Sequence, residues 1–155
     1  LIPMYLLIGV WGSGRKEYAA MKLTLMLMGG SAFLLIGILG IYYGAGAETM
    51  NILEIVKHQI PTEMQRIFFP MVFLGFGVLG ALFPFHTWSP DGHASAPTAV
   101  SMLHAGVLMK LGGYGCFRIA MYLMPTGAAI WGDFFLVLTT ISVVYGAFSA
   151  WYRPT

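Results

Sequence analysis

The apolar residues of this chain gather into five segments that are separated by short polar connections. Residues 21–44 and 128–151 are each long enough to cross a bilayer, which takes about 20 residues in a helix. Residues 1–11 are too short to cross, so we expect them to be the end of a helix in a chain that is a fragment. Residues 51–60 place apolar side chains at helical spacing, which predicts a short amphipathic helix at the membrane interface.

Two further spans lie in the middle of the chain, and the first of them is interrupted. Residues 67–85 contain Pro70, Pro84 and three glycines. Broken spans of this kind expose backbone groups to an ion path in transporters, and a kinked packing helix is the alternative interpretation. A tight connection over residues 86–93 is expected to lead to the fourth span, residues 99–124.

The composition indicates that most of the surface faces lipid. Apolar residues make up 58% of the chain, charged residues make up 9%, and the mean hydropathy is +0.78. In a soluble domain about a quarter of the residues are charged. We therefore predict an all-α integral membrane protein with about four full transmembrane helices and one partial helix, in a single membrane domain over residues 1–155.

The charge balance and the single cysteine exclude several kinds of function. A net charge of +2 is too small to indicate nucleic-acid binding. Cys116 has no second cysteine in the sequence, which excludes disulfides and cysteine-ligated iron–sulfur clusters within the chain. The sequence also lacks a glycine-rich dinucleotide motif. We expect no cofactor and no metal in this chain, and any redox centre should belong to another chain.

The distribution of lysine and arginine predicts the orientation in the membrane. Four cations fall at one end of the predicted helices and two at the other: Arg15, Lys16, Lys22 and Arg153 against Lys57 and Arg66. Positive residues favour the cytoplasmic side. The connections at residues 13–22 and 86–97 are therefore both predicted to be cytoplasmic.

Lys110 is the residue that fits a membrane span least well. It lies about a dozen residues from either end of the fourth span and therefore near the bilayer midplane. A lysine at this depth costs about 2.5–3.5 kcal/mol on insertion, and the same span holds no acidic residue. Because loss of hydration disfavours the charged ammonium, a buried lysine without a stable partner can gain and lose a proton. This favours a proton relay, and an ion pair with another helix is the alternative.

Three histidines are further candidates. His104 precedes Lys110 by six residues and is either a hydrogen-bonded packing residue or an intermediate proton station. His86, Asp91 and His93 occur together in the short connection before the fourth span. Such a group is compatible with a metal site, but it is more typical of a capped or hydrogen-bonded turn.

The connection and the span that carries Lys110 resemble a known family. Residues 83–93 read Phe-Pro-Phe-His-Thr-Trp-Ser-Pro-Asp-Gly-His, and Ala-Pro-Thr follows at 96–98. Residues 101–115 read Ser-Met-Leu-His-Ala-Gly-Val-Leu-Met-Lys-Leu-Gly-Gly-Tyr-Gly. These segments resemble the antiporter-like membrane subunit M of respiratory complex I, the proton-pumping NADH:quinone oxidoreductase, whose mitochondrial counterpart is its subunit 4. The resemblance covers essentially the whole chain.

The resemblance implies a fourteen-helix fold with inverted repeats, of which this chain holds part of the fifth helix and the sixth to the ninth. It implies that Lys110 is the central proton carrier and that Lys22 matches a lysine near the start of the sixth helix. His86 and His93 match the loop histidines of the family. The implied partners are the other membrane subunits of complex I, including neighbouring antiporter-like subunits, and the lipid bilayer, which we expect to be a bacterial plasma membrane.

Departures from the family pattern leave alternatives open. The family carries a lysine seven residues before the loop histidine, where this sequence has Leu79. The glutamate that partners this lysine in the family would precede residue 1. The chain then either pumps protons through Lys110 and His104 or has lost pumping and keeps a structural role. A subunit of a multisubunit sodium/proton antiporter is the remaining interpretation, because related antiporter subunits share the fold and a central lysine.

Overall fold

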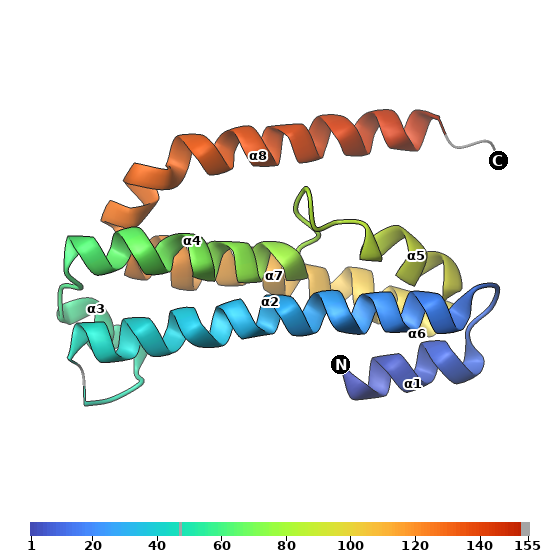
Figure 1. Ribbon diagram of the computed structural model, residues 1–155, viewed down its shortest axis with the longest axis horizontal. Helices are drawn as coiled ribbons and strands as arrows, with labels where there is room; N and C mark the ends of the chain where they lie inside the picture. Colours follow the sequence, from blue (N-terminus) through green and yellow to red (C-terminus); the bar gives the residue numbers. More distant parts are fainter. Residues whose placement is uncertain (47, 153–155) are drawn as a thin grey trace.

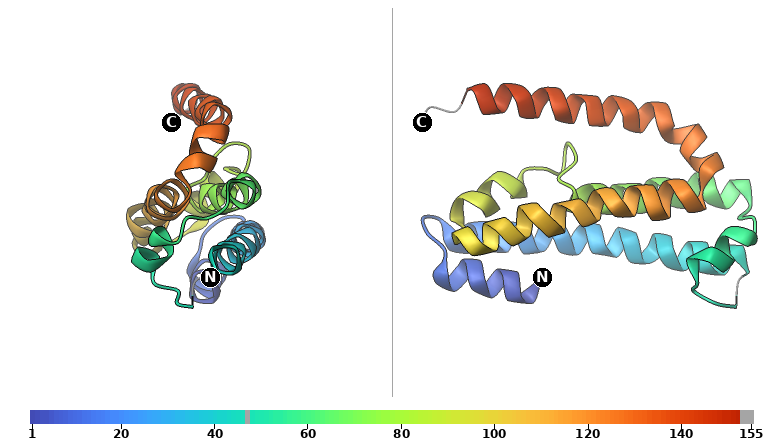
Figure 2. Two further views of the ribbon diagram at one scale, coloured as in Figure 1. Left: turned by 90° about the vertical axis from the view of Figure 1, so that its left-hand side faces the viewer. Right: turned by 180° about the vertical axis from the view of Figure 1, so that it is seen from behind.

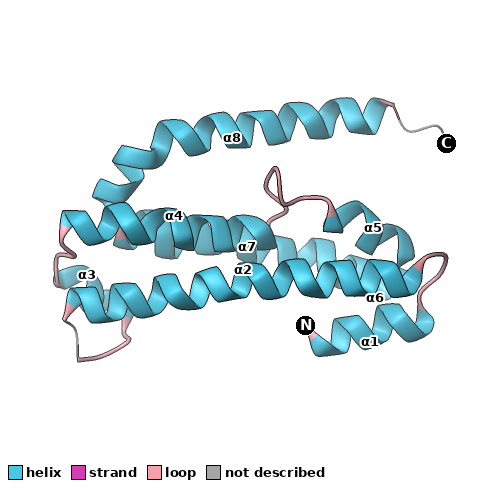
Figure 3. Ribbon diagram, viewed as in Figure 1, coloured by secondary structure: helices cyan, strands magenta, loops and turns pink. Residues whose placement is uncertain are grey.

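The computed structural model describes residues 1–46 and 48–152, so the predicted cytoplasmic cation Arg153 lies outside the described residues. The described chain is helical and contains no β-strand, as Figure 3 shows. This confirms the predicted all-α fold. The elements in chain order are α1 (Ile2–Trp11), α2 (Lys16–Ala45), α3 (Ile52–Lys57), α4 (Thr62–Leu79), α5 (Trp88–Ser95), α6 (Thr98–Leu103), η1 (His104–Leu108), α7 (Met109–Gly115), η2 (Cys116–Met121) and α8 (Pro125–Trp151).

The helices run side by side along one axis, with α2 at the centre of the bundle (Figure 1). α4 packs along α2, and the short helix α1 folds back beside the first half of α2. Among the described helices, α2 and α8 are the two that are individually long and apolar enough to cross a membrane. The other spans are assembled from shorter pieces.

Two groups of buried apolar residues lie at opposite ends of the bundle. One joins α4 to α8 through Phe69 and Phe135, whose rings meet edge to face at 6.0 Å. The other joins α2 to α5 through Leu23, Leu27 and Trp88. Helices in lipid associate mainly by close packing, so these two groups hold the bundle together at both ends.

The third predicted span is broken. α4 continues through Pro70 without interruption and ends at residue 79, and α5 begins nine residues later. Between them, residues 80–87 form a loop in which Ala81 adopts a left-handed conformation with φ 58°. α5 then continues along the first half of α2. Of the two interpretations of this segment, the structure supports the broken span.

The predicted tight connection over residues 86–93 is wrong, because most of it belongs to α5. The indole N–H of Trp88 donates a hydrogen bond to the Val78 carbonyl at 3.1 Å, which anchors the start of α5 on the end of α4. Pro90 and Asp91 occupy the first turn of α5. There a proline loses no helical hydrogen bond and an acidic side chain favours the helix dipole.

The fourth span is continuous but irregular. α6, η1, α7 and η2 follow one another as a single rod, which Figure 2 shows from behind and which confirms the span predicted at residues 99–124. η1 and η2 are π-helical, and they flank the turn that carries Lys110. α7 approaches α4 so closely that a Cβ on Gly112 would lie 2.5 Å from the backbone nitrogen of Gly80. π-Helical turns are rare and occur frequently at functional sites.

α8 leaves the end of this rod and returns across the bundle, standing apart from it over its second half (Figures 1 and 2). Its start is fixed by the buried amide of Gln65, which donates to the Ile60 carbonyl at 2.8 Å and accepts from the Gly127 N–H at 3.1 Å. The indole of Trp131 adds a hydrogen bond to the Arg66 carbonyl. α8 is therefore anchored at its first turns.

The connection between α1 and α2 and the segment 86–97 lie at the same end of the bundle. The Ser13 N–H donates to the Ser95 carbonyl at 2.9 Å, and α5 packs against α2. α3, which carries Lys57, lies at the opposite end (Figure 1). The prediction that the two connections share one side is confirmed.

Candidate functional site

An ion pair joins α2 to α5. The Lys22 ammonium lies 2.6 Å from a carboxylate oxygen of Asp91, and both side chains are partly buried. Lys22 also lies 5.6 Å from the ring centre of Tyr18, one helical turn earlier on α2. This is the one ion pair that the described residues form. It ties the two connections at this end of the bundle together.

Two histidines continue from the ion pair into the bundle. His93 follows Asp91 by two residues, and its Nδ1 lies 2.8 Å from the Ser101 hydroxyl on α6. Its ring centre lies 4.8 Å from that of His104. Gly92 permits this approach, since a Cβ there would meet Leu23 at 3.1 Å and the His104 ring at 3.8 Å. Polar groups from α2, α5 and the fourth span therefore form one row.

His104 lies at the inner end of this row and is completely buried. Its ring packs 5.0 Å from the Trp88 ring, and neither ring nitrogen has a hydrogen-bond partner among the described residues. It is thus a packed histidine, without the hydrogen bonds expected of an ordinary packing residue. An imidazole whose two nitrogens are unbonded can accept a proton on one and release it from the other.

Lys110 does not join this row. Its side chain is exposed on the surface of α7, and within residues 1–46 and 48–152 it forms no hydrogen bond or ion pair. The prediction that Lys110 is buried is therefore wrong for this chain alone. The reason is that Gly112 turns the opposite side of α7 toward α4, which leaves Lys110 on the outward side with Val107 and Leu111.

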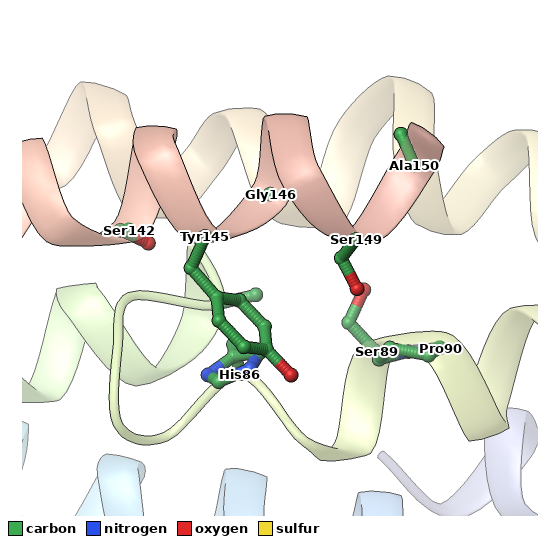
Figure 4. A pocket seen from close by; sticks show the side chains of 9 residues that line it. His86, Ser89, Pro90, Ser142, Tyr145, Gly146, Ser149 and Ala150 are labelled. Atoms are coloured by element: carbon green, nitrogen blue, oxygen red, sulfur yellow. The ribbon is translucent and has the colours of Figure 1, made fainter. Parts of the chain in front are cut away.

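His86 lies apart from the other histidines, in the loop between α4 and α5. Its ring stacks on Phe83 at 5.6 Å and meets the Tyr145 ring edge to face at 4.8 Å. Figure 4 shows it beneath Tyr145 at a cavity between this loop and α8.

The predicted group of His86, Asp91 and His93 is thus dispersed. Each faces a different partner: Tyr145, Lys22 and Ser101, respectively. The segment forms a helix in place of the expected capped turn, and the Thr87 side chain at the helix start makes no capping hydrogen bond. In the described part of the chain, no three His, Cys, Asp or Glu residues are grouped so that they could hold a metal ion.

Three important contacts were not anticipated from the sequence. Asp91 was considered only as a member of a turn, and neither Ser101 nor Tyr145 was singled out. The Lys22–Asp91 pair joins residues 69 positions apart, so no local pattern could reveal it. The helical spacing of polar side chains on residues 142–149 was a usable signal for Tyr145.

Leu79 occupies the end of α4, where the family pattern has a lysine. It is half-buried and packs against the apolar group that contains Leu23, Leu27 and Trp88. The position is therefore filled by an apolar contact.

Comparisons with known proteins agree with this arrangement. The family described as NADH:quinone oxidoreductase/Mrp antiporter, TM, matches residues 1–153. The chloroplastic NAD(P)H-quinone oxidoreductase chain 4 of Citrus sinensis is 43% identical over 148 residues, which cover 95% of this chain and 30% of that protein. An NAD(P)H-quinone oxidoreductase chain 4 of Microcystis aeruginosa is 38% identical over 151 residues, 97% of this chain and 27% of that protein.

A solved structure is also similar. A chain of the respiratory complex I from Thermus thermophilus with bound NADH superimposes with a TM-score of 0.89 at 29% identity. The match covers 98% of this chain and 32% of that chain. The present chain therefore spans about 30% of the length of the relatives it matches. By its fold and its sequence, this integral membrane chain belongs to the NADH:quinone oxidoreductase/Mrp antiporter transmembrane family.

Proposed function

We propose that this chain is part of a proton-translocating membrane subunit of an NADH:quinone oxidoreductase of the complex I type, in which electron transfer drives proton pumping through Lys110. The observation that carries the proposal is a lysine in the middle of a long membrane rod, flanked by two π-helical turns and without a partner in the described chain. Such a residue is expensive in lipid, and reversible proton binding gives it a function.

The row of polar groups supplies an approach for protons toward the fourth span. A proton that reaches Asp91 neutralises its carboxylate and releases the Lys22 ammonium from the ion pair. His93 can take a proton on one ring nitrogen and pass the other through the Ser101 hydroxyl. His104 lies next to His93 and precedes Lys110 on the same rod. Water would have to complete the last step, because Lys110 faces outward.

The proposal assigns the redox chemistry to other subunits. Those partners include neighbouring antiporter-like membrane subunits, and the chain is surrounded elsewhere by lipid. Support comes from relatives named NAD(P)H-quinone oxidoreductase chain 4 and from the similarity to a complex I chain. We further propose a bacterial plasma membrane, since two of the similar proteins are bacterial. Immunogold labelling checks this, and signal confined to photosynthetic membranes would contradict it.

Replacement of Lys110 by methionine in the complete protein tests the proposal. We expect loss of NADH-driven proton pumping in membrane vesicles, with the subunit still assembled, because methionine keeps the length of the side chain but cannot carry a proton. Lys110→Arg separates charge from proton exchange, and Lys57→Met on α3 is the matched control for removal of a cation. Undiminished pumping with normal electron transfer in Lys110→Met would refute the proposed mechanism.

A subunit of a multisubunit sodium/proton antiporter is the second candidate function. The observation in its favour is that the matching family covers both kinds of protein, and fold alone does not decide which function is present. Sodium-dependent proton exchange in vesicles without NADH would favour the antiporter. Co-purification with flavin and iron–sulfur absorbance and with NADH oxidation would favour the oxidoreductase.

A structural subunit without pumping is the third candidate, and Leu79 is the observation that favours it. Proton pumping that survives the loss of Lys110, His104 and Lys22 together, in an assembled complex, would support this function over the other two.

A further inference from the structure

A cavity of about 510 Å³ lies between the second half of α8 and the loop that joins α4 to α5. Hydroxyl groups line it from both sides: Ser89 from α5, and Ser142, Tyr145 and Ser149 from α8 (Figure 4). His86 lies at its base, beneath Tyr145. The cavity is separate from the row of Lys22, Asp91, His93 and His104.

The polar residues of α8 are confined to one side of that helix. Ser142, Tyr145, Gly146 and Ser149 follow the spacing i, i+3, i+4 and i+7, which places them on one face. Val143, outside this set, is 71% exposed and lies away from the cavity lining. A helix that met only lipid on all sides would gain nothing from a row of hydroxyl groups. This face is therefore suited to contact with water.

His86 supplies a second, independent observation. Its Nδ1 is buried, and no residue in the described part of the chain forms a hydrogen bond with it. Buried polar atoms are nearly always paired with protein or with water. The cavity beside it is polar and many times larger than the roughly 30 Å³ that one water molecule occupies. Water in this cavity would satisfy the imidazole.

α8 also holds the loop that carries His86. The Phe83 N–H donates to the Ser142 hydroxyl at 3.3 Å, and the Tyr145 ring covers the imidazole. These contacts fix the position of the imidazole at the cavity wall. The cavity lies toward the end of the bundle that carries the α1–α2 connection (Figure 1).

We propose that this cavity is a water-filled vestibule through which His86 exchanges protons with the aqueous phase on the side of the α1–α2 connection. In each exchange an O–H bond of a hydronium ion breaks and an N–H bond forms on the imidazole, and the positive charge passes from water to the ring. The use of these protons for pumping rests on the proposed function, whereas the presence of water does not.

Cysteine labelling tests the vestibule directly. In the complete protein in its native membrane assembly, Cys116 and any cysteine outside residues 1–155 are first replaced by alanine. Ser149→Cys and Val143→Cys are then compared for reaction with a charged, membrane-impermeant thiosulfonate added from the α1–α2 side. We expect Ser149→Cys to react and Val143→Cys, on the other face of α8, to remain unlabelled. Absence of labelling at Ser149→Cys, or equal labelling of both, would overturn the vestibule.

Filling the cavity links it to function. A Cβ on Gly146 meets nothing within 4 Å, so Gly146→Leu can extend into the cavity without displacing the backbone. Gly132→Leu is the matched control, since Gly132 lies on the same helix, is equally unobstructed and does not line the cavity. We expect Gly146→Leu to slow both the labelling of Ser149→Cys and proton pumping, while Gly132→Leu changes neither.

The outcomes separate this inference from the proposed function. Labelling without any effect of Gly146→Leu on pumping would show that the water does not supply His86, and would overturn the proton-exchange role. Failure of the labelling together with loss of pumping in Lys110→Met would refute the vestibule and leave the proposed function standing. Successful labelling with full pumping in Lys110→Met would do the reverse.

Discussion

Replacement of Gly112 by alanine probes the packing that sets the position of Lys110. A Cβ at residue 112 would lie 2.5 Å from the Gly80 nitrogen and 2.8 Å from the Phe76 carbonyl oxygen. Both are backbone atoms of the α4 end, so they cannot rotate away, and α7 must move outward. Overpacking of this kind costs about 1–3 kcal/mol, and alanine in place of glycine in a helix returns up to about 1 kcal/mol.

Gly113 provides the matched control. It is the next residue on α7, and a Cβ there meets nothing within 4 Å. Gly113→Ala therefore gains the same helix propensity without the clash. The difference between the two variants removes the propensity contribution, and we expect Gly112→Ala to be less stable than Gly113→Ala by about 1–3 kcal/mol in the free energy of unfolding.

Cys116 provides the assay. It follows Gly112 by one helical turn, it is half-buried, and its Sγ lies 3.9 Å from the Phe73 carbonyl of α4. Separation of α7 from α4 should expose it. The complete protein, with any cysteine outside this chain replaced, is heated in detergent with a thiol-reactive fluorophore. We expect Gly112→Ala to react at a lower temperature than wild type and Gly113→Ala at the same or a higher one. Identical transitions in the two variants would refute the close packing.

Three further predictions follow from the described contacts. Lys22→Met leaves the Asp91 carboxylate unpaired, so it should lower thermal stability and pumping more than the double variant Lys22→Met/Asp91→Asn does; equal losses would show that the pair is not coupled. Trp88→Phe keeps an aromatic ring but loses the hydrogen bond to the Val78 carbonyl, and thermal unfolding should show a cost of about 1–2 kcal/mol. Gln65→Leu removes both hydrogen bonds of a buried amide and should cost about 1–3 kcal/mol; an unchanged unfolding temperature would contradict its role in anchoring α8.

The long spans were predictable from the sequence because hydropathy and length determine them. Residues 21–44 were expected to span, and α2 covers Lys16–Ala45. Asn51 was placed at the start of a short helix, and its side chain accepts a hydrogen bond from the Leu53 N–H at the start of α3. Patterns of this kind depend on neighbouring residues alone.

Contacts between distant segments were not predictable in the same way. Pro90 within residues 86–93 suggested a turn, although a proline is also tolerated in the first turn of a helix, and Trp88 fixes that helix through its bond to α4. The outward orientation of Lys110 depends on which side of α7 carries the glycines that touch α4. Neither can be decided from local hydropathy.

The leucine at residue 79 changes the chemistry of this end of the bundle less than its replacement of a charged residue suggests. Leu79 packs with Leu23 and Trp88 in an apolar group, so the fold tolerates the absence of a cation there. The end of the bundle still holds an ion pair in Lys22 and Asp91. Because His93 lies two residues beyond Asp91 and its ring approaches His104, that pair adjoins the polar row without passing through residue 79. Proton transfer toward the fourth span therefore does not require the lysine that this sequence lacks.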